Sequence, residues 1–311
     1  MRLIQGLKGI RKLPKPVVAL GVFDGVHRGH RIIIKAAVSK AKLSKGTSVV
    51  VTFWPHPQKE KTLYSLQHRL RLIDQLGIDV CIVINFNRKF SEISAANFVK
   101  NILSKKIGAE YIFVGKNFRF GRGQEGDHRF LSRLSLVYNF KLKILKVLKV
   151  KNKPISSTYI RLLINQGRLK LAEELLAHPV SILGTVVKGS SLGRRMGFPT
   201  ANIDPHHEVI PPNGIYAVWI IISKRKFQGI CYIGSRPTFA KKNSKRIEVY
   251  IYNFKKKLYG KYLEIQFIQK LRAEQRFDSA LSLVKQIKKD IRKSKASFSP
   301  LRHTTIYAPL Q

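Results

Sequence analysis

The first half of the chain alternates short apolar runs with longer amphipathic stretches. The apolar runs are rich in β-branched residues and lie at 17–23, 48–54, 80–86 and 111–114. Runs of this length and composition are typical of strands buried on both faces of a parallel sheet. The intervening stretches favour helices at 30–45, 65–76 and 94–104, and a helical pair follows at 157–166 and 168–177. This alternation predicts an α/β domain with a parallel sheet and right-handed crossovers.

The pattern changes after residue 180. Short alternating segments, separated by glycine and proline, lie at 182–187, 215–222, 229–233, 247–252 and 263–268. Such segments predict antiparallel β structure, a small barrel or a sandwich. A last helix closes this part, with one apolar face made of Ala280, Val284, Ile287 and Ile291 and a solvated basic face. The sequence therefore predicts two domains, 1–180 and 181–311.

The net charge of the 311-residue chain is far from average. Hydrophobic residues make up 44% and charged residues 24%, as in ordinary globular proteins, but the formal net charge is +42. A nucleic acid or an anionic membrane would attract such a chain. Because the basic residues are spread over both halves rather than gathered in one arm, we keep nucleic-acid binding only as a lower-ranked alternative and expect no membrane partner.

Cysteine usage and the N-terminus favour a cytoplasmic location. Cys81 and Cys231 lie in apolar, strand-like runs, which indicates buried free thiols in a reducing compartment rather than a disulfide. No apolar run approaches the roughly 18 residues of a membrane span. Residues 1–16 are interrupted too often by glycine, lysine and proline for a signal peptide.

A first candidate site follows the first apolar run, where residues 20–30 read LGVFDGVHRGH. Gly25 and Gly29 allow a tight turn, and His27 and His30 are three residues apart at the expected start of a helix, so both rings can face one side. The N-terminus of a helix suits a phosphate, and imidazole N–H groups can stabilise charge that develops on a phosphoryl oxygen. Two histidines alone would more often be surface residues, but with this glycine spacing a phosphate site is favoured.

Three further segments carry similar chemistry. Residues 155–161 read ISSTYIR, and hydroxyls at a helix start with one guanidinium could bind pyrophosphate, although such a segment by itself is more often an ordinary helix cap. Residues 52–57 (TFWPHP) and 114–121 (VGKNFRFG) each follow a predicted strand, at the edge where parallel sheets bind ligands. Residues 121–126 spell GxGxxG but do not follow a strand directly, so we interpret them as a mobile basic loop.

These segments together resemble a known family. The pattern GxFDGxHxGH, paired with the Ser/Thr-rich segment and its arginine, is similar to the nucleotidylyltransferase superfamily with its Rossmann-like domain. TFxPHP and GxNF resemble its FMN-adenylylating branch, the bacterial bifunctional riboflavin kinase/FAD synthetase family. The resemblance implies that His27 and His30 are catalytic. It implies ATP or FMN binding by Gly21, Phe23, Asp24, Gly25, Gly29, His56, Asn117, Ser156, Ser157, Thr158 and Arg161.

A second candidate phosphate site lies at residues 189–202, which read GSSLGRRMGFPTAN. Thr200 and Asn202 are two apart, so in an extended segment their oxygens point the same way and are compatible with Mg²⁺ that also binds water and phosphate. The chemistry alone is weak evidence, because a glycine- and arginine-rich loop is often only a loop. In residues 247–252 (IEVYIY), alternation places Glu248 opposite an apolar face, where without further information it is a solvent-facing glutamate.

The stretch GRxxGFPTAN resembles the Mg–ATP site of the riboflavin kinase module, and residues 212–217 and 234–239 match further elements of it. The resemblance implies that Glu248 is the catalytic base and that Thr200 and Asn202 bind the metal. It implies ATP or flavin binding by Gly189, Gly193, Arg194, Gly197, Pro199, Arg272, Glu274 and Phe277. The family commonly has other residues at Tyr232, Tyr250 and Asn253, which leaves the kinase rate open.

The expected activity is a two-step synthesis of flavin cofactors. Riboflavin and ATP would give FMN, and FMN and a second ATP would give FAD, with Mg²⁺ as the cofactor. An FAD synthetase with an impaired kinase module is the alternative within the same family. The sequence does not determine the oligomeric state.

Overall fold

The computed structural model describes residues 1–57, 62–150, 152–189, 192–206, 208–235 and 245–298. Contacts between residues divide the chain into two compact units, Met1–Ser157 and Thr158–Gln311. The sequence-based domain boundary at residue 180 remains a prediction.

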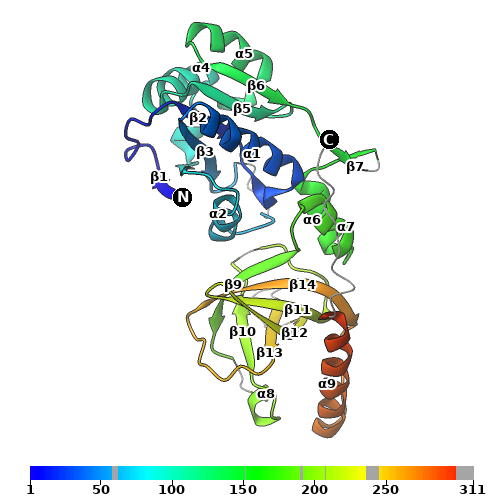
Figure 1. Ribbon diagram of the computed structural model, residues 1–311. Helices are drawn as coiled ribbons and strands as arrows, with labels where there is room; N and C mark the ends of the chain where they lie inside the picture. Colours follow the sequence, from blue (N-terminus) through cyan, green and yellow to red (C-terminus); the bar gives the residue numbers. More distant parts are fainter. Residues whose placement is uncertain (58–61, 151, 190–191, 207, 236–244, 299–311) are drawn as a thin grey trace. The chain divides into compact units, whose positions relative to one another are not determined.

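The first unit is built on a six-stranded sheet in which every pair of neighbouring strands is parallel, in the order β1-β4-β3-β2-β5-β6 (Figure 1). The central strand β2 is buried along its whole length, which explains its uninterrupted apolar sequence. The strands are β1 (Arg2–Gln5), β2 (Pro16–Leu20), β3 (Thr47–Trp54), β4 (Val80–Asn85), β5 (Tyr111–Gly115) and β6 (Lys141–Leu145).

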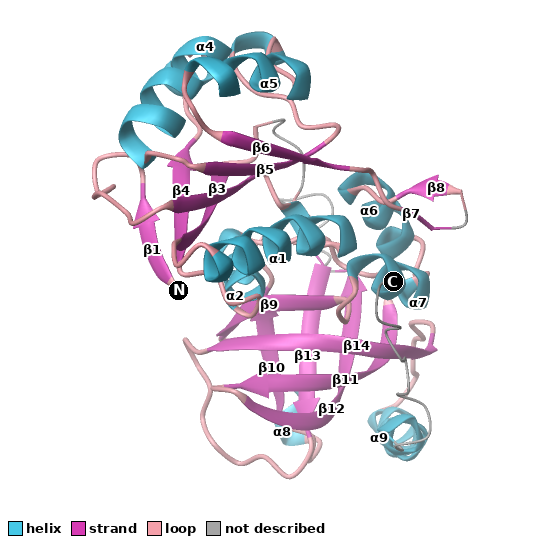
Figure 2. Ribbon diagram, turned by 45° about the horizontal axis from the view of Figure 1, so that its top comes forward, coloured by secondary structure: helices cyan, strands magenta, loops and turns pink. Residues whose placement is uncertain are grey.

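Helices cover both faces of this sheet (Figure 2). Helix α1 (Arg28–Leu43) lies against β2, β3 and β5. On the other face, the π-type helix η2 (Phe98–Ile107) and α5 (His128–Val137) add apolar side chains to a core that includes Leu20. The remaining helical segments are η1 (Asp24–Val26), α2 (Leu66–Asp74), α3 (Arg88–Ser91), α4 (Ala95–Asn97) and η3 (Arg122–Gln124).

The strand order changes direction between β2 and β5. Strands β3 and β4 follow β2 on one side, whereas β5 and β6 continue on the other. In open parallel sheets, ligands bind outside the carboxyl ends of the strands at such a point. The loop after β2, which carries the two histidines, and the loop after β5 both begin there.

The parallel sheet expected from the sequence is confirmed, with local differences. Strands β1 and β6 and helix α5 were not anticipated. Strand β1 is short, and β6 begins with two alternating lysines, Lys141 and Lys143. The glycines at 121–126 form a closed turn rather than the expected mobile loop, since Phe120 and Gly126 exchange two backbone hydrogen bonds. Gly121 also lies so close to α4 that a Cβ there would be 2.6 Å from the backbone nitrogen of Ala95.

The second unit contains a closed antiparallel barrel in the order β10-β13-β12-β11-β14-β9. This confirms the barrel rather than the sandwich. Strand β10 was not anticipated as a strand. The strands are β9 (Ser181–Val187), β10 (Thr200–Asp204), β11 (Gly214–Ile222), β12 (Arg225–Ser235), β13 (Lys245–Ile251) and β14 (Tyr262–Arg272).

A two-stranded ribbon of β7 (Lys149–Val150) and β8 (Lys153–Pro154) precedes α6 (Ser157–Asn165) and α7 (Leu169–Leu176) in the chain. Helix α8 (Leu192–Arg195) lies between β9 and β10.

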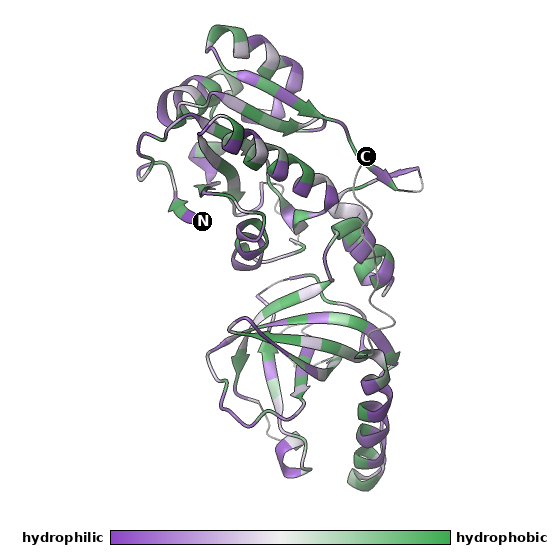
Figure 3. Cartoon of the chain, viewed as in Figure 1, coloured by the Kyte–Doolittle hydropathy of each residue, from purple (hydrophilic) through white to green (hydrophobic). Residues whose placement is uncertain are grey.

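Helix α9 (Ala280–Lys295), followed by the short η4 (Ala296–Phe298), lies against β11, β12 and β14. Figure 3 shows α9 as largely hydrophilic with apolar residues interleaved. The expected apolar face is only partly right, because Ala280 is exposed and the most buried residues of α9 are Asp290 and Ser294. Asp290 forms an ion pair with Arg272 at 2.9 Å, so charge as well as apolar contact holds the helix.

In the described part of the chain, no helix is both long and apolar enough to cross a bilayer.

Candidate active sites

Two imidazoles stack at the carboxyl end of β2. The ring centroids of His27 and His30 are 3.5 Å apart and their planes differ by 18°. His27 caps α1, where its Nδ1 accepts the backbone N–H of His30. The ring of Phe23 lies edge-on to His30, with centroids 5.3 Å apart. The two histidines thus face the same side of a helix start, as their spacing predicts.

His30 is held in its neutral form. Burial lowers the pKa of His30 well below the ordinary value of 6.5, and the neighbouring His27 and Arg69 lower that pKa further. The Nδ1 atom of His30 is buried and has no hydrogen-bond partner among the described residues. A buried nitrogen of this kind is costly unless a ligand satisfies it, and a neutral imidazole can donate its N–H to an oxygen that gains charge.

Asp24 shapes the loop between β2 and α1. Its carboxylate is only 2% exposed and accepts the backbone N–H of Leu63 at 2.9 and 3.0 Å. The chain turns sharply on both sides of it, with φ of 53° at Phe23 and 78° at Gly25. The side chain therefore connects the histidine loop to the segment that leads into α2.

Ser157 connects this loop to the second sequence motif. Its hydroxyl donates a hydrogen bond to the backbone carbonyl of Asp24 at 2.9 Å. Ser156 precedes it and is half-buried, whereas Thr158 and Arg161 lie on α6 beyond the boundary of the first unit. The structure therefore brings Ser157 to the histidine loop. The roles of Thr158 and Arg161 at that loop remain predictions.

Arg69 is a residue at this site that the sequence analysis missed. It lies on α2, is fully buried, and donates hydrogen bonds to the backbone carbonyls of Val22 and Phe53. These carbonyls lie just beyond β2 and near the end of β3. Charged residues on an amphipathic helix ordinarily face solvent, so the sequence gives no sign that Arg69 points inward. Only the packing of α2 shows that it does.

The other predicted residues of this site lie at the same edge of the sheet. Asn117 follows β5 and is exposed, and His56 follows β3 and is half-buried. Gly21 lies directly after β2, and a Cβ there would come within 3.0 Å of the Phe23 ring. Gly29 faces the imidazole of His27 in the same way, at 3.3 Å.

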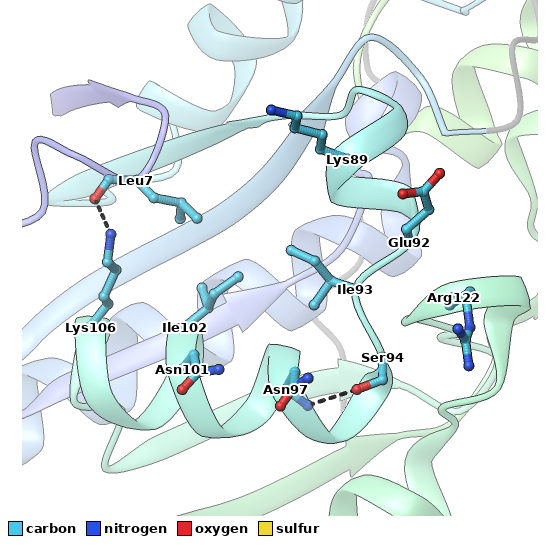
Figure 4. A pocket seen from close by; sticks show the side chains of 10 residues that line it. All are labelled: Leu7, Lys89, Glu92, Ile93, Ser94, Asn97, Asn101, Ile102, Lys106 and Arg122. Atoms are coloured by element: carbon cyan, nitrogen blue, oxygen red, sulfur yellow. Dashed lines mark hydrogen bonds between the residues drawn. The ribbon is translucent and has the colours of Figure 1, made fainter.

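A cavity of about 550 Å³ elsewhere in the first unit contains none of the predicted residues (Figure 4). It is lined by side chains from the Leu7 loop, α3, η2 and η3, including Lys89, Lys106 and Arg122. We assign no substrate to this cavity, because Lys106 instead donates to the carbonyl of Leu7.

In the second unit, the glycines of the 189–202 segment make room for the two predicted metal ligands. A Cβ on Gly189 would lie 2.0 Å from Nδ2 of Asn202, and a Cβ on Gly193 would lie 3.0 Å from Oγ1 of Thr200. Thr200 and Asn202 are alternate residues of β10, so both project from the same face of the barrel. The described residues contain no cluster of His, Cys, Asp or Glu able to hold a metal. The neutral oxygens of Thr200 and Asn202 fit a hard cation that takes its other ligands from phosphate and water.

Glu248 lies directly beside these residues. In the pairing of β10 with β13, Asn202 is opposite Glu248 and Thr200 is opposite Tyr250. Directly opposite residues of an antiparallel pair project to the same side. The neighbours Ile247 and Val249 are buried inside the barrel, which confirms the alternation expected from the sequence. The carboxylate of Glu248 accepts from Nε of Arg246 at 2.8 Å, so it has a fixed orientation.

A polar network extends from Glu248 across the next strand. Tyr232 is opposite Glu248 in the pairing of β12 with β13, and its hydroxyl donates to Glu274. Asn213 donates to the second oxygen of Glu274 at 3.0 Å. Burial, and then the hydrogen bond to Glu274, raise the pKa of Tyr232 to about 12. The departure from the family at Tyr232 is therefore part of a defined network.

The remaining predicted residues of this unit lie on α8, just before β10, and at or just after the end of β14. Arg272 donates several hydrogen bonds to Asp290 and so connects α9 to the barrel. Its guanidinium lies 5.6 Å from the ring centroid of Phe277. Arg194 is exposed on α8, and Gly197 has a φ of 84°. Pro199 precedes β10 and is exposed. Residues 236–239 of the matching element 234–239 lie outside the described residues.

Comparisons with known proteins agree with this geometry. The family model described as FAD synthetase matches residues 10–159, and the model described as riboflavin kinase matches residues 176–298. A bifunctional riboflavin kinase/FMN adenylyltransferase from Buchnera aphidicola subsp. Schizaphis graminum is 37% identical, over 96% of this chain and 99% of that protein. The proteins of the same name from Escherichia coli K12 and Bacillus subtilis are 34% and 33% identical, each over 93% of this chain and over 96% and 94% of their own lengths.

A solved structure from Streptococcus pneumoniae, described as a macrolide-efflux protein, superimposes with a TM-score of 0.82 and 28% identity. It covers 95% of this chain and 99% of its own. The match supports the architecture of both units. Both family models match, and the relatives are similar over nearly the full length of the chain. The chain therefore belongs to the bifunctional riboflavin kinase/FMN adenylyltransferase family.

Proposed function

We propose that this chain carries out both reactions of its family at two separate sites. It is a transferase of flavin cofactor synthesis, which converts riboflavin and ATP to FMN, and FMN and ATP to FAD and pyrophosphate. The first reaction belongs to the barrel and the second to the parallel sheet. Within this proposal the residues of each site have the following roles.

In FAD synthesis, an oxygen of the FMN phosphate attacks the α-phosphorus of ATP, and the bond to the β-phosphate oxygen breaks to release pyrophosphate. His27 and His30 donate N–H groups to the transferring phosphoryl group as its charge increases. Ser156, Ser157, Thr158 and Arg161 bind the leaving pyrophosphate, and His56 and Asn117 position the substrates. Such transfers depend mainly on positioning and electrostatic stabilisation.

In FMN synthesis, Glu248 accepts the proton of the ribityl 5′-hydroxyl while the hydroxyl oxygen attacks the γ-phosphorus of ATP. Thr200 and Asn202 would hold Mg²⁺, which neutralises charge on the phosphates when bound. The backbone of the Gly189–Gly193 segment and the side chain of Arg194 bind the phosphates. Arg246 fixes the orientation of the Glu248 carboxylate.

The observation that best supports the proposal is the pair of stacked imidazoles with a buried, unpartnered Nδ1 of His30. Structural histidines rarely leave such an atom unsatisfied, and a bound phosphate oxygen would supply the missing partner. The two free cysteines, Cys81 and Cys231, are buried, which supports our placement of the protein in the reducing cytoplasm.

A product assay tests the proposal. Purified protein is incubated with riboflavin, ATP and Mg²⁺, and the products are separated by chromatography. FMN and FAD should both form, and omission of Mg²⁺ should stop FMN formation. If supplied FMN yields FAD but riboflavin yields nothing, the kinase part of the proposal is wrong. If neither flavin is converted, the whole proposal is wrong.

A further inference from the structure

Arg69 lies beneath the histidine loop and is more deeply buried than a surface helix requires. Its side chain is 0% exposed. One terminal nitrogen donates to the carbonyl of Val22 and the other donates to the carbonyl of Phe53 at 3.2 Å. These two carbonyls belong to the segments that carry the histidines and His56, respectively. A single guanidinium therefore ties together the two loops that border the proposed ATP site.

The hydrogen bonds alone do not explain an arginine at this position. The carbonyl of Val22 already accepts a hydrogen bond from the hydroxyl of Thr52 at 2.8 Å, so it would remain satisfied without Arg69. The Nε of Arg69 is buried and has no partner among the described residues. A buried guanidinium is costly and keeps its charge under almost all conditions. The additional property that Arg69 supplies is a fixed positive charge.

The charge of Arg69 acts on His30, whose pKa it lowers. Burial lowers the pKa of Arg69, while Asp24 and, more weakly, Cys81 oppose that shift. Burial raises the pKa of the Cys81 thiol to about 12, so this group is neutral and Asp24 is the counter-charge. Among the described residues of the first unit, the titratable groups that act on His30 are His27, at the start of the same helix, and Arg69, from α2.

We propose that Arg69 is a positioning residue for adenylyl transfer, which fixes the loop carrying His27 and His30 and places a permanent positive charge beneath that pair. The charge discourages protonation of the imidazoles before ATP arrives, and it attracts the polyphosphate when ATP binds. The inference rests on the proposed role of the histidine pair in FAD synthesis. In this proposal Arg69 touches no reacting atom. It acts through the loop that it holds in place and through the electric field of its guanidinium.

Two substitutions separate the charge of Arg69 from its hydrogen bonds. Arg69→Lys keeps the charge and one donor, whereas Arg69→Gln keeps a donor and removes the charge. Thr52→Val is the matched control, because it removes a donor to the same carbonyl of Val22 without changing any charge. All variants are made in the full chain, so FMN formation by the second unit shows that the preparation is active.

Two quantities are measured for each variant: kcat/KM for FAD formation from supplied FMN, and the titration of His30 by NMR in histidine-labelled protein. Arg69→Gln should lower kcat/KM roughly 10- to 100-fold. The pKa of His30 should rise measurably but stay below its ordinary value, because burial and His27 still lower it. Arg69→Lys should restore most of the activity and the low pKa. Thr52→Val should leave the His30 titration unchanged.

The inference is overturned if His30 titrates alike in wild type, Arg69→Lys and Arg69→Gln, or if Thr52→Val shifts it as much as Arg69→Gln. In either case Arg69 is only a structural clamp. If Arg69→Gln fails to fold, Arg69→Met takes its place, because it also removes the charge while keeping a long side chain in the same buried position. A His30 titration that is alike in Arg69→Met and Arg69→Lys then overturns the inference. The proposed function fails separately, if His30→Ala still forms FAD at the wild-type rate.

Discussion

The hydroxyl of Ser157 donates a hydrogen bond to the backbone carbonyl of Asp24, 2.9 Å away, although the two residues are 133 positions apart in the chain. Asp24 lies in the loop with the stacked imidazoles, and Ser157 is the first residue of α6. This contact joins the two sequence motifs on which the nucleotidyl-transfer assignment rests. Its loss should therefore affect the geometry of the first site more than the fold of the first unit.

Ser157→Ala should reduce FAD formation while FMN formation continues. One hydrogen bond of this kind contributes about 1 kcal/mol to stability, so the first unit should remain folded. The loop that carries His27 and His30 would lose its hydrogen bond to Ser157. Ser135→Ala is the matched control, because among the described residues the hydroxyl of Ser135 donates only to the carbonyl of Ser132 within its own helix. Equal rates of FAD formation in the two variants would contradict this prediction.

The low pKa of His30 predicts a pH-dependent stability. Below about pH 6.5 the unfolded chain takes up a proton at His30 that the folded chain does not, so the unfolding free energy decreases as the pH falls from 6.5 toward the lowered pKa. His30→Gln removes this contribution and should make the dependence less steep. Urea denaturation at a series of pH values below 6.5 measures the unfolding free energy, with His128→Gln on α5 as the control. An unchanged slope in His30→Gln would show that burial does not hold His30 neutral.

Gly189→Ala should impair the kinase reaction. The added Cβ would lie 2.0 Å from Nδ2 of Asn202, which must then move. We expect FMN formation to fall roughly 10-fold or more, mainly through a higher KM for Mg–ATP, while FAD formation from supplied FMN is retained. The double variant Gly189→Ala/Asn202→Ala should be no worse than Asn202→Ala alone, because the clash is relieved. Additive losses would exclude this explanation.

Asp290→Ala should detach α9 from the barrel. It leaves the guanidinium of Arg272 without its buried partner, at a cost of about 3 kcal/mol. The melting temperature of the second unit and the rate of FMN formation should both decrease. Glu92→Ala is the control, since the Arg88–Glu92 pair is exposed and its loss should change little. A wild-type melting temperature for Asp290→Ala would contradict the prediction.

The sequence was sufficient to predict the parallel sheet, the barrel, and the two loops that carry the motifs at residues 20–30 and 189–202. Buried parallel strands such as β2 are continuously apolar, whereas β13 alternates between buried apolar and half-buried residues. Both patterns can be recognised in the sequence. Strand β6 was missed because an edge strand with alternating lysines reads as a basic loop. The glycines at 189 and 193 were recognised as flexible, but their actual function, making room for Asn202 and Thr200, depends on contacts that no sequence period reports.

Charges at the sites were harder to predict. Arg69 and Asp290 lie on amphipathic helices where a charged residue ordinarily faces solvent, and both are buried here. The resemblance places Arg272 near the flavin, and in the structure its guanidinium donates hydrogen bonds to Asp290 on α9. The sequence predicts which residue types are available, whereas tertiary packing decides which charges are paired and which approach a ligand.

The account depends above all on two separable sites, and one crossed measurement tests this directly. His30→Ala and Glu248→Gln are each assayed by chromatography with riboflavin and with FMN as the starting flavin. His30→Ala should convert riboflavin to FMN and form at least about 100-fold less FAD than wild type. Glu248→Gln should leave riboflavin unchanged and still convert supplied FMN to FAD. If each folded variant loses both activities together, or retains both, the two-site account is wrong.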